Sequence, residues 1–336
     1  MKKILIAFVL SIFLLSGVFA QVTYDNLETS FSQFSKDVSE ALPFASTTGL
    51  QWSQAYMGGF PHFGVGLSVG AVTIPEKTFT DLAKNLGFTL PDKLTSLEIG
   101  VPLPGYTLDA RIGLPFLPLD VGVKLGMIPP GTIDRDKTDV GVDYTLAGVD
   151  VRLPVIKQNV ILPAVSLGVG FNYLSSTVST TATGLANTID LTSLGLGLSD
   201  ITFSNPDVAF TMESKVIDAK LQVSKSLLIF TPYVGFGYAY GWSTAGGGML
   251  ADIFYDGSAI TQSDIDTINQ TLKDNGQTPL DLSSNQVLIT RDNTGGAFRA
   301  FGGVSINILI LKIDISGMYN VNTKSLGANI NTRISF

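Results

Sequence analysis

The stretch Ala328–Phe336, ANINTRISF, decides the fold because two kinds of side chain alternate along it. Successive side chains of a β-strand point to opposite faces, so a period of two separates an apolar face from a polar one. The apolar set is Ala328, Ile330, Thr332, Ile334 and Phe336, and the polar set is Asn329, Asn331, Arg333 and Ser335. The stretch therefore predicts a strand with one apolar and one polar face, and the printed chain stops at the aromatic residue Phe336.

The same alternation recurs upstream and predicts an all-β, antiparallel barrel of ten strands. The connections alternate between short turns and long segments, and an even strand number is typical of such barrels. The long connections are expected at 75–104, 128–138, 175–207 and 243–296, with a short exception at 322–325. Strand-like pieces in the long connections, Ile189–Leu198 and Val287–Thr290, leave twelve to fourteen strands open. The ten expected strands are Phe63–Gly70, Tyr106–Leu114, Leu119–Gly126, Val140–Leu146, Val165–Tyr173, Ile217–Ser224, Val234–Trp242, Ala300–Ile308, Leu311–Val321 and Ala328–Phe336.

The first twenty residues are typical of an export signal. Lys2 and Lys3 precede an apolar core, and Val18-Phe19-Ala20 resembles a small-residue cleavage site. We expect cleavage after Ala20. The predicted organisation is a signal peptide at 1–20, an N-terminal plug or hatch-like segment at 21–60, and a transmembrane barrel at 61–336.

Composition agrees with a membrane barrel. The mean hydropathy is +0.33 and only 15% of the 336 residues are charged. The signal, the alternating last strand and the terminal Phe336 together resemble bacterial outer-membrane, porin-like β-barrel proteins. The resemblance implies location in the outer membrane, contact with its lipid, and recognition of the strand ending at Phe336 by the barrel-assembly machinery.

The charged side chains of the strands must face the lumen, because a Lys or Arg facing lipid at mid-membrane costs about 2–4 kcal/mol. These charges either satisfy one another or line a water-filled channel. Asp139 and Asp143 are assigned to the same inward face. The predicted lumen charges are Asp109, Arg111, Asp120, Lys124, Asp218, Lys220, Arg299, Lys312, Asp314 and Arg333.

Glycines recur on the inward faces, for example Gly168, Gly170 and Gly237. They either leave space for a ligand or an inserted plug, or mark bends that let the barrel close.

The N-terminal segment contains an amphipathic pattern. Leu27, Phe31, Phe34 and Val38 recur at helical spacing, and Pro43-Phe44 is expected to end the helix. Its apolar face would be buried in the lumen or against the periplasmic rim. The predicted plug or ligand-binding residues are Phe31, Phe34, Phe44 and Trp52.

The long connections are also apolar, and two of them suggest helices, one through Phe79, Leu82 and Leu86 and one through Ile265, Ile268 and Leu272. Apolar external loops combined with an N-terminal plug resemble the architecture of the long-chain fatty-acid transporter barrels. That resemblance implies passive uptake of a small hydrophobic compound. A general polar porin and a structural or adhesive surface barrel are the alternatives.

An enzymatic role is not expected. The single histidine, His62, falls at the start of the first strand, at the predicted periplasmic end, whereas outer-membrane lipases and proteases need a histidine near the external rim. No residue pattern points to a cofactor or a metal site. The net charge of −7 argues against nucleic acid as a partner.

Overall fold

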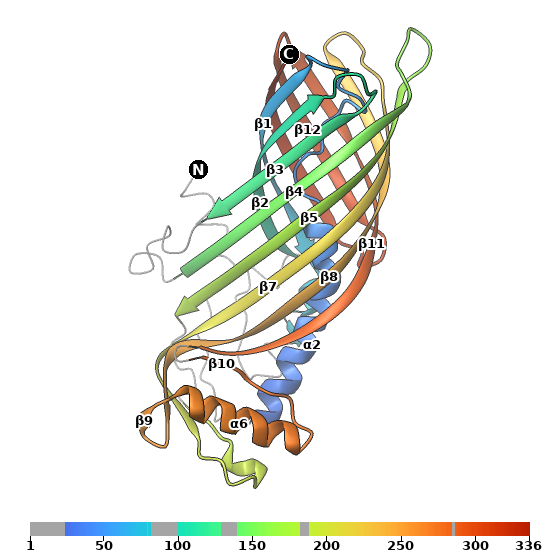
Figure 1. Ribbon diagram of the computed structural model, residues 1–336. Helices are drawn as coiled ribbons and strands as arrows, with labels where there is room; N and C mark the ends of the chain where they lie inside the picture. Colours follow the sequence, from blue (N-terminus) through green and yellow to red (C-terminus); the bar gives the residue numbers. More distant parts are fainter. Residues whose placement is uncertain (1–23, 79, 82–99, 129–139, 182–187, 284–285) are drawn as a thin grey trace.

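Ten long strands close into an antiparallel barrel in the computed structural model, which describes residues 24–78, 80–81, 100–128, 140–181, 188–283 and 286–336 (Figure 1). Sequential neighbours pair around the ring, β8 pairs with β11, and β13 closes on β1 with Gly64 opposite Ser335. The ten-strand prediction is confirmed. The strands are β1 (Phe63–Ile74), β2 (Val101–Gly113), β3 (Asp120–Ile128), β4 (Val140–Ile156), β5 (Ala164–Thr181), β7 (Ile201–Ser224), β8 (Phe230–Tyr255), β11 (Gln286–Ile308), β12 (Leu311–Asn320) and β13 (Leu326–Ser335).

The extra strand-like pieces do not enlarge the ring. Val287–Thr290 lies inside β11, and Ile189–Leu198 contains only the end of the two-residue strand β6 (Thr188–Ile189) and the short helix η1 (Thr192–Leu194). Two other short strands, β9 (Ser258–Ala259) and β10 (Asp281–Ser283), extend the sheet at its edges. The alternative of twelve to fourteen barrel strands is therefore wrong.

The two ends of the barrel differ. The turns at 114–119, 157–163, 225–229 and 309–310 lie at one end, together with Phe336; we call it the short-turn end. It is at the top in Figure 1. Because outer-membrane barrels have short periplasmic turns, this end is the periplasmic one. At the opposite, external end β7, β8 and β11 continue for 24, 26 and 23 residues.

These long strands explain an error in the predicted loops. The segments 175–207 and 243–296 were expected to be mostly loop, yet much of each is strand. A tilted strand needs only about 9–11 residues to cross a bilayer. The external halves of β7, β8 and β11 therefore stand outside the membrane. There the outward face is polar and the inward face is apolar, the reverse of the membrane-spanning part; we call this reversal the change of sign.

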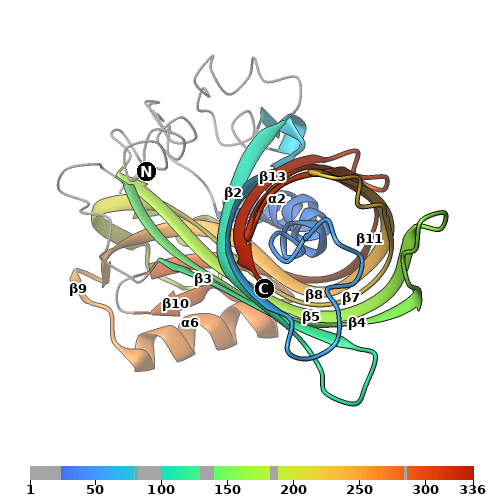
Figure 2. The same ribbon diagram turned by 90° about the horizontal axis from the view of Figure 1, so that it is seen from above.

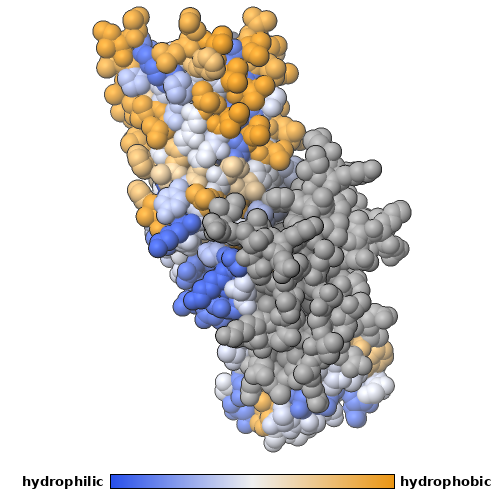
Figure 3. Space-filling view, turned by 180° about the vertical axis from the view of Figure 1, so that it is seen from behind, coloured by the Kyte–Doolittle hydropathy of each residue, from blue (hydrophilic) through white to orange (hydrophobic). Residues whose placement is uncertain are grey.

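The change of sign is clear in β7. Near the short-turn end Ile217 and Leu221 are exposed on the outer face and Asp218 is buried in the lumen. Nearer the external end the outer face carries Glu213 and Lys215. Figure 3 shows the consequence, with hydrophobic residues over the upper part of the barrel and hydrophilic ones below.

An aromatic boundary marks where the change occurs. Exposed Tyr238, Tyr240, Trp242 and Phe298 lie on the outer faces of β8 and β11. Aromatic residues gather at both interfaces of membrane barrels, so this level is the external edge of the lipid-facing belt.

In β4 the change of sign corrects two assignments. Val142, Tyr144 and Leu146 are buried, not lipid-facing, because they lie in the external half. Asp143 alternates with them and so does not belong to the lumen face. Asp139 lies outside the described residues, as do the predicted signal peptide and the predicted helix through Phe79, Leu82 and Leu86.

Helix α2 (Tyr24–Ala45) occupies the lumen, as Figure 2 shows from above. It packs on β11, β8 and β7. The helix passes Pro43 and ends two residues later, so Pro43-Phe44 does not stop it at once. Of the two locations considered for this segment, the structure shows the lumen and not the periplasmic rim.

A second helix, α6 (Gln262–Asp274), covers the external end and confirms the helix expected around Ile265, Ile268 and Leu272, which are all buried. Thr261 and Asp264 form a capping box at its start. The hydrogen bond from Thr261 lowers the pKa of the Asp264 carboxyl. In the described part of the chain, no helix combines the length and the apolarity needed to cross a membrane.

Candidate functional site: the plugged lumen

The lumen is filled by the chain itself. Residues 41–53, which include the end of α2 and the extended segment after it, are buried without exception. We call residues 41–57 the plug segment. It runs from the middle of the barrel towards the short-turn end, where β1 begins. Of the predicted residues, Phe44 and Trp52 belong to it, and Phe31 and Phe34 lie further along α2.

Charged side chains of the wall hold the backbone of the plug segment. Lys124 Nζ donates to the carbonyl of Ser46 at 2.7 Å and also to that of Thr48. The backbone N–H of Leu50 donates to Asp109 Oδ2 at 2.9 Å. Buried backbone groups must find partners, and an extended segment cannot supply its own. These lumen charges therefore act as hydrogen-bond partners for the plug.

The same arrangement continues towards the short-turn end. The N–H of Met57 donates to Asp120 Oδ2 at 3.0 Å, and Arg152 donates to the carbonyl of Gln54 at 2.6 Å. Half-buried Lys312 donates to Gln54 Oε1 at 3.0 Å. The plug is thus bound along its length to β2, β3, β4 and β12.

Trp52 is the central side chain of the plug and is completely buried. The guanidinium carbons of Arg333 and Arg111 lie 4.8 and 5.7 Å from its ring. A cation over an indole face gains about 0.5–2 kcal/mol, more when water is excluded. Gln222 also donates to the carbonyl of Trp52 at 2.8 Å. Trp52 is therefore held in the lumen by contacts with two wall arginines.

Behind the plug, the wall charges pair with one another. Arg111 bridges Asp120 and Asp150 at 2.5 and 2.6 Å, and Arg152 binds Asp120 at 2.8 Å. We call these pairs the ion-pair belt. Its other pairs are Lys220–Asp150 at 2.5 Å, Arg299–Asp218 at 2.8 Å, and Arg333–Asp314.

Asp150 and Arg152 were not among the predicted lumen charges. The predicted strand ended at Leu146, where its apolar inward residues give way to polar ones. The alternation of Val149, Val151 and Leu153 with Asp150 and Arg152 was the available signal, because it repeats the pattern of β2 and β3.

Glycines make room for the belt and for the plug. A Cβ on Gly122 would lie 2.6 Å from Asp150 Oδ1, and one on Gly64 would lie 3.0 Å from the Trp52 ring. A Cβ on Gly247 would clash with the ring of Phe31. Of the two roles considered for the inward glycines, the structure favours a bed for the plug and for side chains lying flat on the wall.

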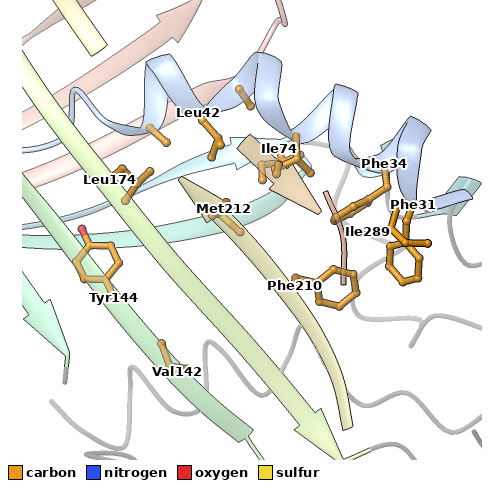
Figure 4. Close-up of a cluster of buried hydrophobic side chains, with 14 of the residues drawn as sticks. Phe31, Phe34, Leu42, Ile74, Val142, Tyr144, Leu174, Phe210, Met212 and Ile289 are labelled. Carbon is orange, nitrogen blue, oxygen red and sulfur yellow. The ribbon is translucent and has the colours of Figure 1, made fainter. Parts of the chain in front are cut away.

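The external half of the lumen is apolar. Phe31 and Phe34 of α2 face Phe210 of β7, and the ring centroids of Phe34 and Phe210 are 5.1 Å apart (Figure 4). Leu42 and Phe44 are completely buried, and the other core residues of this cluster are buried as well. A cavity beside the end of α2, lined by Ala45, Thr48, Tyr144 and Leu174 among others, measures about 10 Å³. That is room for about one water molecule.

His62 lies exposed at the short-turn end, where its Nδ1 is 2.7 Å from the carbonyl of Gly59 in its own loop. Within the described residues, no group of three His, Cys, Asp or Glu side chains is arranged to hold a metal ion.

The architecture also has relatives among known proteins. A family model described as Lsa36-like matches residues 15–336. The chain belongs to the Lsa36-like family. The Lsa36-like chain matches no curated protein. Its closed ring, lipid-facing belt and aromatic boundary are those of an outer-membrane β-barrel.

Solved structures that resemble this Lsa36-like barrel are distant. The outer-membrane protease OmpT from Escherichia coli has a TM-score of 0.38 at 7% identity, covering 82% of this chain and 97% of its own. The translocator domain of the autotransporter NalP from Neisseria meningitidis scores 0.36 at 8%, covering 93% and 99%. A FadL homologue from Pseudomonas aeruginosa scores 0.28 at 9%, covering 96% and 99%. Scores this low carry no argument about function.

Proposed function

We propose that this chain is a non-enzymatic surface barrel that keeps its own lumen closed and presents its folded external region, around α6, to the outside of the cell. The complete burial of residues 41–53 carries the proposal. A solute cannot pass this lumen unless the plug segment leaves its hydrogen bonds to the wall. A structural or adhesive role needs no such movement, and for the same reason we do not favour an open polar porin.

Cysteine labelling tests this arrangement cleanly, because the chain contains no cysteine of its own. Gln270→Cys places a thiol on the exposed face of α6, and Val65→Cys places one on the lipid-facing belt. We expect a membrane-impermeant maleimide to label Gln270→Cys, but not Val65→Cys, on intact cells. Purified full-length protein should show no steady conductance in planar bilayers. Labelling of α6 only after the outer membrane is opened, or a stable open channel, would refute the proposal.

Uptake of small hydrophobic compounds such as fatty acids is the second candidate, favoured by the apolar external half of the lumen. An acyl chain could take the place that the rings of Phe31 and Phe34 occupy against Phe210. Uptake then requires α2 to withdraw. Mass spectrometry of the purified protein should find a bound lipid or detergent molecule, and more of it in a Phe31→Ala/Phe34→Ala variant. Absence of any such molecule from both proteins would count against uptake.

Export and assembly belong to the same proposal. We expect signal cleavage after Ala20, which N-terminal sequencing of the mature protein checks. The barrel would contact outer-membrane lipid and be assembled by the barrel-assembly machinery through the strand ending at Phe336. Phe336 stacks on Phe63 with ring centroids 5.1 Å apart, at the seam of the barrel. Phe336→Ala should lower the amount of folded protein in the outer membrane, and unchanged assembly would contradict this role.

A further inference from the structure

The tips of all four short turns carry apolar residues that touch almost nothing. Phe116, Val160, Leu228 and Leu309 are 104%, 95%, 101% and 94% exposed. Turns at a protein surface are normally built from Gly, Pro, Asn, Asp and Ser, because these residues suit water and tight backbone geometry. Fully exposed branched and aromatic side chains at four separate tips need another explanation.

The exposed apolar tips continue the lipid-facing belt, although the turn at 157–163 also carries exposed Lys157, Gln158 and Asn159. Leu117, Ile161, Leu162, Ile229 and Ile310 flank the tips and are exposed as well. Figure 3 shows hydrophobic residues reaching the upper edge of the molecule, where the short turns lie. The apolar surface therefore continues from the barrel wall onto the turns.

The backbone of the turn at 157–163 finds its hydrogen-bond partners within the protein. Lys225 Nζ donates to the carbonyls of Asn159, Val160 and Leu162 at 2.7, 3.0 and 3.1 Å. The side-chain oxygen of Asn159 accepts the N–H groups of Ile161 and Leu162 at 2.8 and 2.7 Å. Loops in water have no need of such coverage, whereas backbone groups in a lipid environment must be paired internally.

A neighbouring turn follows the same rule. The side-chain oxygen of Gln158 accepts the N–H of Ser226 at 2.8 Å. Gln158, Asn159 and Lys225 of these two turns thus bind turn backbone, and the apolar side chains are left outside.

We propose that the short-turn end does not project into the periplasm but is immersed in the periplasmic leaflet of the membrane, with Phe116, Val160, Leu228 and Leu309 at the boundary between the acyl chains and the headgroups. The occupant is lipid because all four turns carry exposed apolar tips, and these tips continue the lipid-facing belt. A protein partner would need a patch on one side. This immersion is independent of the proposed surface role, since the short turns can lie in the periplasmic leaflet whatever the external region binds.

The height of the belt agrees with immersion. Along β8 the outward face is apolar or aromatic from Trp242 to Phe230, at the start of the strand. That length is already slightly more than the roughly 9–11 residues that cross a bilayer. The turn at 225–229 therefore lies at the acyl–headgroup boundary of the inner leaflet, a depth at which Lys225 can extend its charge towards the headgroups.

Depth-dependent fluorescence quenching tests the proposal. In a Trp52→Phe/Trp242→Phe background, Leu228→Trp places the only tryptophan at a tip, and the matched control Gln270→Trp places it on exposed α6. In phosphatidylcholine vesicles brominated on the acyl chains, we expect the tip tryptophan to lose more than about half of its emission and to resist aqueous iodide. The control should behave in the opposite way.

Val160→Trp in the same background repeats the measurement at a second turn, so the test survives misfolding of one variant. Heat-modifiable mobility on gels verifies that each barrel is folded. Quenching of the folded tip variants by iodide and not by brominated lipid would overturn the proposal, and would place the tips in water, free for a periplasmic protein. Unchanged surface labelling of Gln270→Cys would show that the surface role stands regardless.

Discussion

Phe34→Ala should loosen α2 from the barrel wall without opening the barrel itself. Phe34 is buried, and its ring packs on Phe210 and, edge-on at 6.5 Å, on Phe31. Truncating a buried Phe to Ala typically costs about 3–5 kcal/mol. The wall strands keep all of their ladder hydrogen bonds, so the loss falls on the docking of the helix. At about 1.4 kcal/mol per tenfold, undocking becomes roughly a hundredfold to a few thousandfold more frequent.

Hydrogen–deuterium exchange followed by mass spectrometry measures this directly. Peptides from α2 should exchange faster by that factor in Phe34→Ala, while peptides from β7 and β8 keep their protection. Lys36→Ala is the matched control, because Lys36 lies on the exposed side of the same helix. Surface substitutions of this kind stay within about 0.5 kcal/mol. Equal exchange of α2 in the two variants, or equal acceleration of helix and wall, would refute independent docking of α2.

Three further predictions follow from the wall, the plug and the external helix. Gly122→Ala should lower the free energy of unfolding by about 1–3 kcal/mol, because its Cβ would lie 2.6 Å from a carboxylate oxygen of the ion-pair belt. Gly295→Ala should leave the free energy of unfolding unchanged, because a Cβ at Gly295 would have no heavy atom within 4 Å, and urea unfolding in vesicles compares the two variants. Trp52 is 0% exposed and Trp242 is 48% exposed, so brominated lipid should quench the emission of a Trp52→Phe variant and spare that of a Trp242→Phe variant; the reverse would mean that the lumen and lipid faces are exchanged. The lowered pKa of Asp264 means that its capping contribution is fully present above the ordinary carboxyl pKa of about 4 and is lost as the pH falls through the lower folded-state value. The protection of the α6 amides, taken relative to their intrinsic exchange rate at each pH, should therefore fall in acid, and Asp264→Asn should remove that acid dependence.

The local pattern was enough to predict the ring of strands. Ten dyad segments and the alternation of short and long connections led to the observed strand number, because each face of a membrane strand meets one medium over its whole crossing. The same reasoning failed in β4. There Val142, Tyr144 and Leu146 form an apolar face that turned out to be internal. Alternation shows that two faces differ, but it cannot say which face meets lipid once a strand leaves the membrane.

The predicted lumen charges were identified one at a time, by the cost of exposing them to lipid. Their partners were not predictable. Arg299 and Asp218 are 81 residues apart in sequence, and Arg111 and Asp150 are 39 apart. Such pairs depend on the register between strands, which places a glycine such as Gly122 between the two partners. Only the closed sheet sets that register. Asp109 could be placed in the lumen, but not recognised as an acceptor for the backbone of Leu50.

The sequence by itself determined a ten-stranded barrel with charges inside and an amphipathic segment before the first strand, because these follow from side-chain period and from the cost of burying charge in lipid. Only the tertiary structure decided that this segment enters the lumen and fills it. The decision rests on contacts between residues far apart in the chain, such as Lys124 with Ser46 and Arg333 with Trp52, and no local pattern encodes them.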